Sequence, residues 1–163
     1  MISEKMEKTL NDQINAEFFS SYLYLAMAAY FESKNWNGFA AWMKAQSNEE
    51  YLHAMKFFKY VSDVEGRVKL GSIEKPEFEW KSPLHAFEEA HKHELYITDR
   101  VNKLVSQANE EKDYATGLFL NYFVTEQVEE VSTVSQIVHK LKLINDNPSS
   151  LYFLDRELGM RAK

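Results

Sequence analysis

Apolar residues recur at alternating steps of three and four along four long stretches of the chain. This spacing keeps side chains on one face of a helix. Only five glycines and three prolines interrupt the 163 residues, and long stretches contain neither, which favours long helices over a sheet. We expect helices over about 3–34, 38–65, 82–109 and 114–145, with a short fifth helix over about 150–159. The pattern therefore predicts an all-α protein.

Residues 66–81 separate the second and third predicted helices and alternate without a helical period, so we expect an extended crossover there. A connection of this length lets the chain return along a bundle and start the third helix in the same direction as the second. Ser82 followed by Pro83 predicts a helix start, because a hydroxyl caps the first turn and proline suits the first helical position. The expected architecture is a four-helix bundle with a long crossover and a short C-terminal helix, forming one domain over 1–163.

The apolar stripe of each long helix is interrupted by polar residues near its midpoint. The interrupting acids are Glu17, Glu50, Glu94 and Glu130, and His53 follows Glu50 by three residues. A buried carboxylate without a partner is costly, or its pKa shifts until it neutralises. Because the midpoints of aligned helices meet at one height, the four acids should converge inside the bundle. Four converging carboxylates predict bound cations.

Composition limits the classes of protein to which this chain can belong. A hydrophobic content of 45% fits a globular domain, and the net charge of -6 without a long basic cluster argues against a nucleic-acid partner. The absence of cysteine excludes disulfides, iron-sulfur clusters and cysteine-bound zinc. No segment approaches the roughly 20 apolar residues of a membrane span, and the first ten residues do not resemble a signal peptide. We therefore expect a cytoplasmic protein with no membrane partner.

Carboxylates and one imidazole, with no thiolate, suit Fe, Mn or Zn, and the residues alone do not choose among these ions. Glu50 and His53 form a Glu-x-x-His step, which places a carboxylate and an imidazole on adjacent turns of one helix face. The step is common by chance. Its position on an inward stripe, facing three other glutamates, makes it specific.

These residues resemble the ferritin family over essentially the whole chain, and in particular the non-haem ferritins of prokaryotes. The resemblance implies two iron positions that share Glu50. One iron would be held by Glu17, Glu50 and His53. The other would be held by Glu50, Glu94 and Glu130.

Further residues match positions around the iron centre of the family. Gln127 would lie beside the iron pair, and Tyr24 matches a tyrosine that could supply an electron or a hydrogen bond during oxidation. Microbial members also carry a third iron position. Its implied ligands here are Glu49, Glu126, Glu129 and Glu130.

Departures from related families narrow the resemblance. Thr133 stands where bacterioferritins and rubrerythrins have a second histidine ligand, and Tyr51 stands where bacterioferritins have the haem methionine, so haem is not expected. A rubrerythrin would also need a cysteine-rich iron domain. The carboxylates that guide iron through the threefold channels of animal ferritins are replaced by Gly117 and Leu120. The resemblance therefore does not extend to that channel.

The implied activity is iron storage with ferroxidase chemistry. Two Fe(II) ions would bind and be oxidised by dioxygen or peroxide, and the ferric product would move to a mineral core inside a homo-oligomeric cage. In the ferritin family 24 subunits build this shell. The short fifth helix over 150–159, too small to stand alone, would line the fourfold axis.

Two other functions are compatible with the residues. One is a di-iron oxidase or oxygenase that acts on an organic substrate in the same fold. The other is a metal-free bundle that binds another protein, which would leave the buried acids unexplained. Each glutamate could also be a solvated surface acid if the helix phase differed, and Tyr24 could serve packing alone. His91 and His93 are expected at the surface or edge, without a role.

Overall fold

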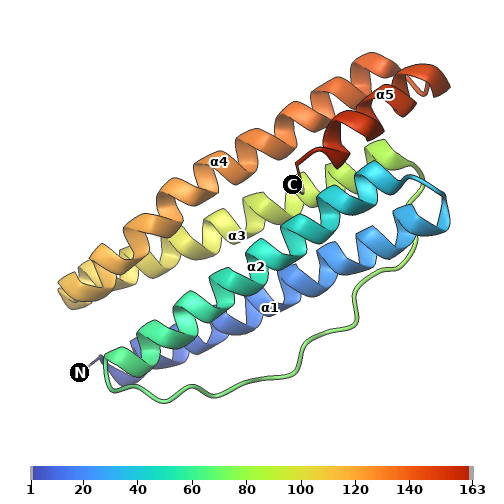
Figure 1. Ribbon diagram of the computed structural model, residues 1–163. Coiled ribbons are helices and arrows are strands. Elements are labelled where there is room, and N and C mark those ends of the chain that lie inside the picture. Colours follow the sequence, from blue (N-terminus) through green and yellow to red (C-terminus); the bar gives the residue numbers. More distant parts are fainter. Residues whose placement is uncertain (1, 162–163) are drawn as a thin grey trace.

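The computed structural model describes residues 2–161, and these residues form five helices and no strand. The helices are α1 (Glu4–Ser33), α2 (Asn37–Asp63), α3 (Pro83–Glu111), α4 (Tyr114–Ile144) and α5 (Pro148–Gly159). Helices α1 to α4 lie side by side as a bundle, and α5 packs near one end of it (Figure 1). The predicted all-α class and the short C-terminal helix are confirmed.

Short turns join α1 to α2 and α3 to α4, so each pair is antiparallel. Residues 64–82 instead run along the bundle from the end of α2 to the start of α3, which makes these two helices parallel (Figure 1). Asn11 of α1 holds the start of this crossover, because its Nδ2 donates to the Arg67 carbonyl at 2.9 Å and its Oδ1 accepts from the Lys69 amide at 2.6 Å. The crossover is the predicted one.

Side-chain caps set the start of four of the helices. A side-chain oxygen accepts a hydrogen bond from the amide three residues later at Ser3, Ser82, Asp113 and Asn147. Each cap satisfies one of the amides that the first helical turn leaves without a partner. Because Asn147 provides such a cap and Pro148 suits the first position, α5 begins two residues earlier than expected.

Two apolar clusters fill the ends of the bundle and leave its middle to polar residues. One cluster, near α5, includes Phe31, Phe39, Trp42, Phe87 and Leu154. The other, at the opposite end, includes Leu10, Phe57, Leu104, Leu120 and Phe123. Burial of aromatic and aliphatic side chains at both ends drives the helices together. Packing at both ends also keeps the polar midpoints of the four helices at the same level along the bundle axis.

The inward face of α3 differs from the expected one. Steps of four, three and four residues from Glu94 predict an inward stripe through Thr98, Val101 and Val105. Instead Ile97 and Leu104 are buried, and Thr98 and Val105 are partly exposed. The alternating spacing is present, but it runs one residue earlier on either side of Glu94. Because a helix has 3.6 residues per turn, stripes chosen from different starting residues share some positions and differ at others.

Helix α5 lies against the start of α2 through a contact that requires glycine. A Cβ atom added at Gly38 would overlap the backbone carbonyl of Asp155, and one added at Gly159 would lie 3.0 Å from the Gly38 Cα. The Asp155 carboxylate accepts a hydrogen bond from the Phe39 amide at 2.8 Å. Between residues 2 and 161, no helix combines the length and the apolar character needed to cross a membrane.

Candidate metal centre

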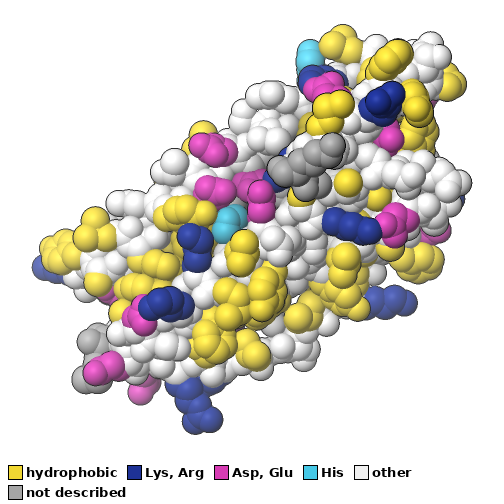
Figure 2. All heavy atoms as spheres, in the orientation of Figure 1, with side chains coloured by type: hydrophobic (Ala, Val, Ile, Leu, Met, Phe, Trp, Pro, Cys, Tyr) yellow, Lys and Arg dark blue, Asp and Glu magenta, His cyan; other side chains and the backbone are white. Residues whose placement is uncertain are grey.

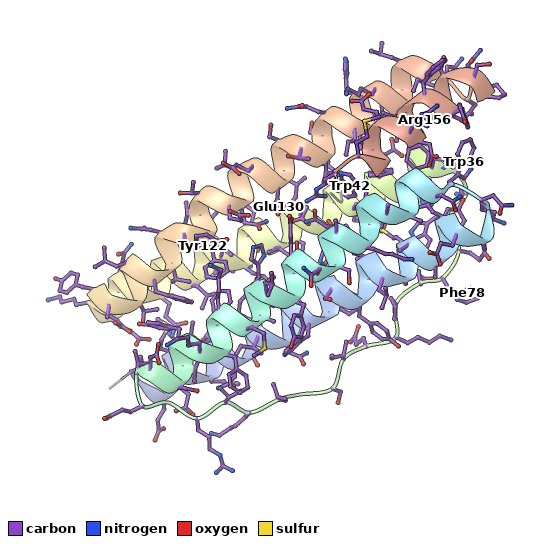
Figure 3. The ribbon with its side chains drawn as sticks, in the orientation of Figure 1. Trp36, Trp42, Phe78, Tyr122, Glu130 and Arg156 are labelled. Carbon is purple, nitrogen blue, oxygen red and sulfur yellow. The ribbon has the colours of Figure 1, made fainter. Side chains whose placement is uncertain are left out.

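The five predicted ligands meet at the middle of the bundle, and each is at most 6% exposed. Ligand atoms of Glu17, Glu50 and His53 lie within 4.8 Å of one another, and so do those of Glu50, Glu94 and Glu130. Glu50 belongs to both groups, so it can bridge two cations. Figure 3 shows Glu130 midway along α4, on the side that faces α2. A cation held by three such side chains would keep coordination positions open for water or an oxidant.

Burial without a charge partner raises the pKa of these carboxyl groups. Desolvation, followed by the charge of Glu50, raises the pKa of Glu17 to about 8. Desolvation, followed by the charge of Glu94, raises the pKa of Glu130 to about 7. The pKa of Glu50 lies well above its ordinary value and that of Glu94 is also raised, chiefly because both are desolvated. A cation would reverse these shifts, since it stabilises the ionised form.

One carboxylate oxygen in the centre has no hydrogen-bond donor. Glu17 Oε1 accepts from Gln13 Nε2 at 2.7 Å, but Glu17 Oε2 is buried and has no partner within residues 2–161. A buried acceptor without a donor costs free energy, so such atoms are rare in folded proteins. A cation at the first group of ligands would use this oxygen. The donor set therefore fits a hard or borderline metal ion.

Two glutamines orient the carboxylates by donating hydrogen bonds to them. Gln13 precedes Glu17 by four residues, and Gln46 precedes Glu50 by four, so each pair shares a helix face. Gln46 Nε2 donates to Glu50 Oε1 at 2.9 Å and to Glu130 Oε2 at 2.7 Å. No role was predicted for either glutamine, although the repeated Gln-x-x-x-Glu spacing is visible in the sequence.

An arginine in turn fixes the amide of each glutamine. Arg100 Nε donates to Gln13 Oε1 at 2.9 Å, and Arg161 Nη2 donates to Gln46 Oε1 at 2.8 Å. Because arginine only donates, each glutamine oxygen must face its arginine, and the amide nitrogen is left for the carboxylate. Nothing in the sequence indicated these two arginines, because both come from distant parts of the chain.

Tyr24 and Gln127 both contact Glu94, as their predicted positions beside the centre require. The Tyr24 hydroxyl donates to Glu94 Oε1, and Gln127 Nε2 donates to Glu94 Oε2 at 3.1 Å. Burial, followed by the charge of Glu94, raises the pKa of Tyr24 well above its ordinary value. Tyr24 therefore keeps its proton and acts as a donor at neutral pH.

His93, for which no role was expected, packs against this tyrosine. Its ring meets the Tyr24 ring edge-on at 6.3 Å, and its Nε2 lies 2.7 Å from Ser20 Oγ. Burial lowers the pKa of His93 to about 4, so the ring is neutral at physiological pH. His93 is half-buried, which is compatible with the expected edge position, and its ring packs against Tyr24.

The residues predicted for a third metal position are not gathered into one group. Glu126 Oε1 lies 3.8 Å from His53 Nε2, Glu49 Oε2 accepts from Arg161 Nη2 at 2.7 Å, and Glu129 is exposed. In the described part of the chain, no cluster with the 4.8 Å spacing contains Glu49, Glu126 or Glu129. These three side chains lie at the partly exposed edge of the centre.

Binding of a divalent cation at pH 6.5 is expected to release protons. The raised pKa values of Glu17, about 8, and Glu130, about 7, keep both groups largely protonated at that pH, and a cation displaces the protons. The release should fall as the pH rises through 8. Titration calorimetry with Zn²⁺, in two buffers of different ionisation enthalpy, measures the number of protons. Glu17→Gln should release fewer, and equal heats in both buffers at pH 6.5 would contradict the expectation.

Comparison with known proteins extends over nearly the whole chain. A sequence model of the family described as Ferritin-like domain matches residues 7–144. The bacterial non-heme ferritin of Bacteroides fragilis is 44% identical over 161 residues, which are 99% of this chain and 100% of that protein. The bacterial non-heme ferritin of Staphylococcus aureus is 36% identical over 162 residues, which are 99% of this chain and 98% of that protein.

Solved structures show the same similarity. The open pore ferritin of the hyperthermophilic archaeon Archaeoglobus fulgidus superposes with a TM-score of 0.97 and is 52% identical, and the match covers 98% of both chains. An engineered closed form of the same archaeal ferritin superposes with a TM-score of 0.96, also at 52% identity, over 98% of this chain and 97% of that one. The similarity spans the bundle and its C-terminal helix.

Proposed function

This chain belongs to the ferritin family, and we propose that it is an iron-storage ferroxidase. It binds two Fe(II) ions as substrates at mid-bundle, oxidises them with dioxygen or peroxide, and passes the ferric product to a mineral core inside a cage. The observation that carries this proposal is the pair of ligand groups that share Glu50. The residues proposed to act are the five ligands together with Tyr24 and Gln127.

The geometry suits a reaction that needs two electrons at once. Each Fe(II) gives up one electron, and two adjacent ions can therefore reduce one dioxygen to peroxide. Glu50 is the group that keeps the two ions adjacent. The carboxylates stabilise the additional positive charge of Fe(III), and Tyr24, which donates to Glu94, is placed to supply a hydrogen bond or an electron.

The product must leave, and the edge of the centre offers a path. Glu49, Glu126 and Glu129 are partly or fully exposed next to His53 and Glu130. Figure 2 shows acidic side chains around a histidine midway along the displayed face. We propose that these acids, with Glu130, form a third iron position through which ions pass between the pair and the solvent.

Assembly into a cage of 24 identical subunits is proposed from the family and from exposed apolar side chains. On α5, Tyr152 and Phe153 are 55% and 72% exposed. On α1 and α2, Leu25 and Leu52 are 48% and 49% exposed. Exposed apolar groups of this size favour contacts between subunits. In this assembly α5 lines the fourfold axis.

A large pocket outside the metal centre gives no support to a reaction on an organic substrate beside the metals. It measures about 740 Å³, lies between α1, α3 and the crossover, and is lined by none of the five ligands. Its lining residues include Asp12, Asn15, Ser72, Tyr96 and Lys103. An oxygenase in this fold would need space next to the iron pair.

Aerobic addition of Fe(II) to the purified protein tests the proposal. We expect rapid growth of ferric absorbance, together with a particle of cage size that retains many irons per subunit. Rapid oxidation by a small oligomer without retention would favour the oxidase function. Oxidation no faster than in buffer alone would contradict ferroxidase activity.

A further inference from the structure

The residues after α5 bring a positive charge to the edge of the metal centre. We propose that Arg161 is a tethered cation that positions Gln46 toward the metal ligands and excludes a metal ion from Glu49 until the arginine is released. The inference rests on the proposed function, because it assumes that the mid-bundle carboxylates bind metal. It adds a positioning residue from the C-terminal turn to that site.

Arg161 is held by three different groups of α2. Its Nη2 donates to Gln46 Oε1 at 2.8 Å and to Glu49 Oε2 at 2.7 Å. Its guanidinium carbon lies 4.4 Å from the centre of the Trp42 ring, a cation-π distance. The Arg161 side chain is 27% exposed and the Glu49 side chain 43%, so solvent screens part of this ion pair, and the contacts with Gln46 and Trp42 add to it. The C-terminal turn is therefore docked on α2 by a specific contact.

Gln46 transmits this contact to two ligands. Because Arg161 holds the Gln46 oxygen, the amide nitrogen points to Glu50 Oε1 and Glu130 Oε2, at 2.9 and 2.7 Å. Without the arginine, the Gln46 amide is free to rotate and present its oxygen to the carboxylates. The two hydrogen bonds that orient Glu50 and Glu130 in the metal-free protein would then be lost. Groups that orient metal ligands in this way affect metal affinity.

Glu49 cannot serve the arginine and a metal ion equally well. Its Oε2 is already bonded to Arg161, and a divalent cation bound there would lie close to the guanidinium charge. An ion at this edge therefore binds only as Arg161 leaves. The two effects are reciprocal. The factor by which Arg161 lowers the affinity for such an ion equals the factor by which the bound ion weakens docking of the C-terminal turn.

Zn²⁺ titration of the full-length protein tests this inference without any oxidation step. We expect the parent to bind two ions per subunit tightly and a third ion weakly. Arg161→Gln should tighten the third ion about tenfold, a coupling typical of linked sites. Arg161→Lys should give a smaller change, because it keeps the charge but loses the forked geometry.

Matched variants separate this role from general damage to α5. Arg156 is exposed on the same helix, and Arg156→Gln should leave all three affinities unchanged. In a Glu49→Gln background, Arg161→Gln should no longer tighten the third ion, because the competing carboxylate is gone. Tryptophan fluorescence gives a second readout, since release of the guanidinium from Trp42 should change the emission as the third Zn²⁺ binds to the parent, but not to Arg161→Gln.

The possible results distinguish the two proposals. A parent that binds no Zn²⁺ tightly would refute the metal centre and, with it, the proposed function. A parent that binds two ions, with an unchanged third affinity in Arg161→Gln, would refute the role of Arg161 alone. A third ion that binds more weakly in Arg161→Gln would also overturn it, because competition requires the opposite direction.

Discussion

Replacement of Glu50 by alanine is expected to slow the initial oxidation of Fe(II) more than about 100-fold, while the protein still assembles. Loss of a group that only orients a metal ligand lowers metal affinity or activity roughly 10- to 100-fold. Glu50 belongs to both ligand groups, so its loss should lower the oxidation rate further. Assembly should persist because Glu50 is only 1% exposed and does not lie on the subunit surface. The rate is measured by ferric absorbance, and assembly by particle mass.

Two further variants make this comparison specific. Glu50→Gln keeps the side-chain volume and removes the charge, and it should also be slow. Glu110→Ala removes an exposed carboxylate at the far end of α3 and should oxidise iron at the parent rate. If Glu50→Ala oxidised iron at the parent rate, the bridging position of this residue would be wrong.

Gly38→Ala should displace α5 and prevent assembly of the cage. The added Cβ would overlap the backbone carbonyl of Asp155, which cannot move without its helix. Overpacking of a fixed contact costs about 1–3 kcal/mol, occasionally more, and here it would also strain the hydrogen bond between Asp155 and the Phe39 amide. We expect cleavage of the C-terminal segment under limited proteolysis, with particle mass falling from a cage to small oligomers.

Gly117→Ala is the matched control for this prediction. Nothing lies within 4 Å of a Cβ added at Gly117, and the residue lies within α4. Alanine there should stabilise the helix by up to about 1 kcal/mol and leave α5 docked, with the parent resistance to proteolysis. A Gly38→Ala protein with the parent mass and the parent resistance to proteolysis would show that α5 docks elsewhere.

The bundle and the positions of its five central residues followed from sequence because one rule governs both. A stripe that recurs every three or four residues must face inward, and a glutamate on such a stripe is anomalous wherever it occurs. The four glutamates lie at similar distances from the starts of their helices, and Glu50 and His53 are one turn apart. These positions place the centre at mid-bundle. The crossover was predicted because residues 66–81 are too many for the short turn that joins two antiparallel helices.

The residues that support the metal ligands could not be predicted, because they depend on contacts between distant segments that no local sequence pattern encodes. Arg100 and Arg161 reach the centre from α3 and from the C-terminal turn, so only the folded chain brings them to Gln13 and Gln46. The buried face of α3 differs from the stripe through Thr98 and Val105 for another reason, because this helix has apolar residues on two neighbouring stripes. The contact of His93 with the centre was missed because the rings of Phe19 and Tyr24, which pack against it, come from α1.

X-ray diffraction from crystals soaked in Fe(II) without oxygen, recorded at the iron absorption edge, tests the metal centre most directly. We expect two anomalous peaks per subunit, one among Glu17, Glu50 and His53, and one among Glu50, Glu94 and Glu130. Glu50 should lie between the two peaks. Peaks found only at surface carboxylates, with none in the bundle, would contradict an iron pair at these residues.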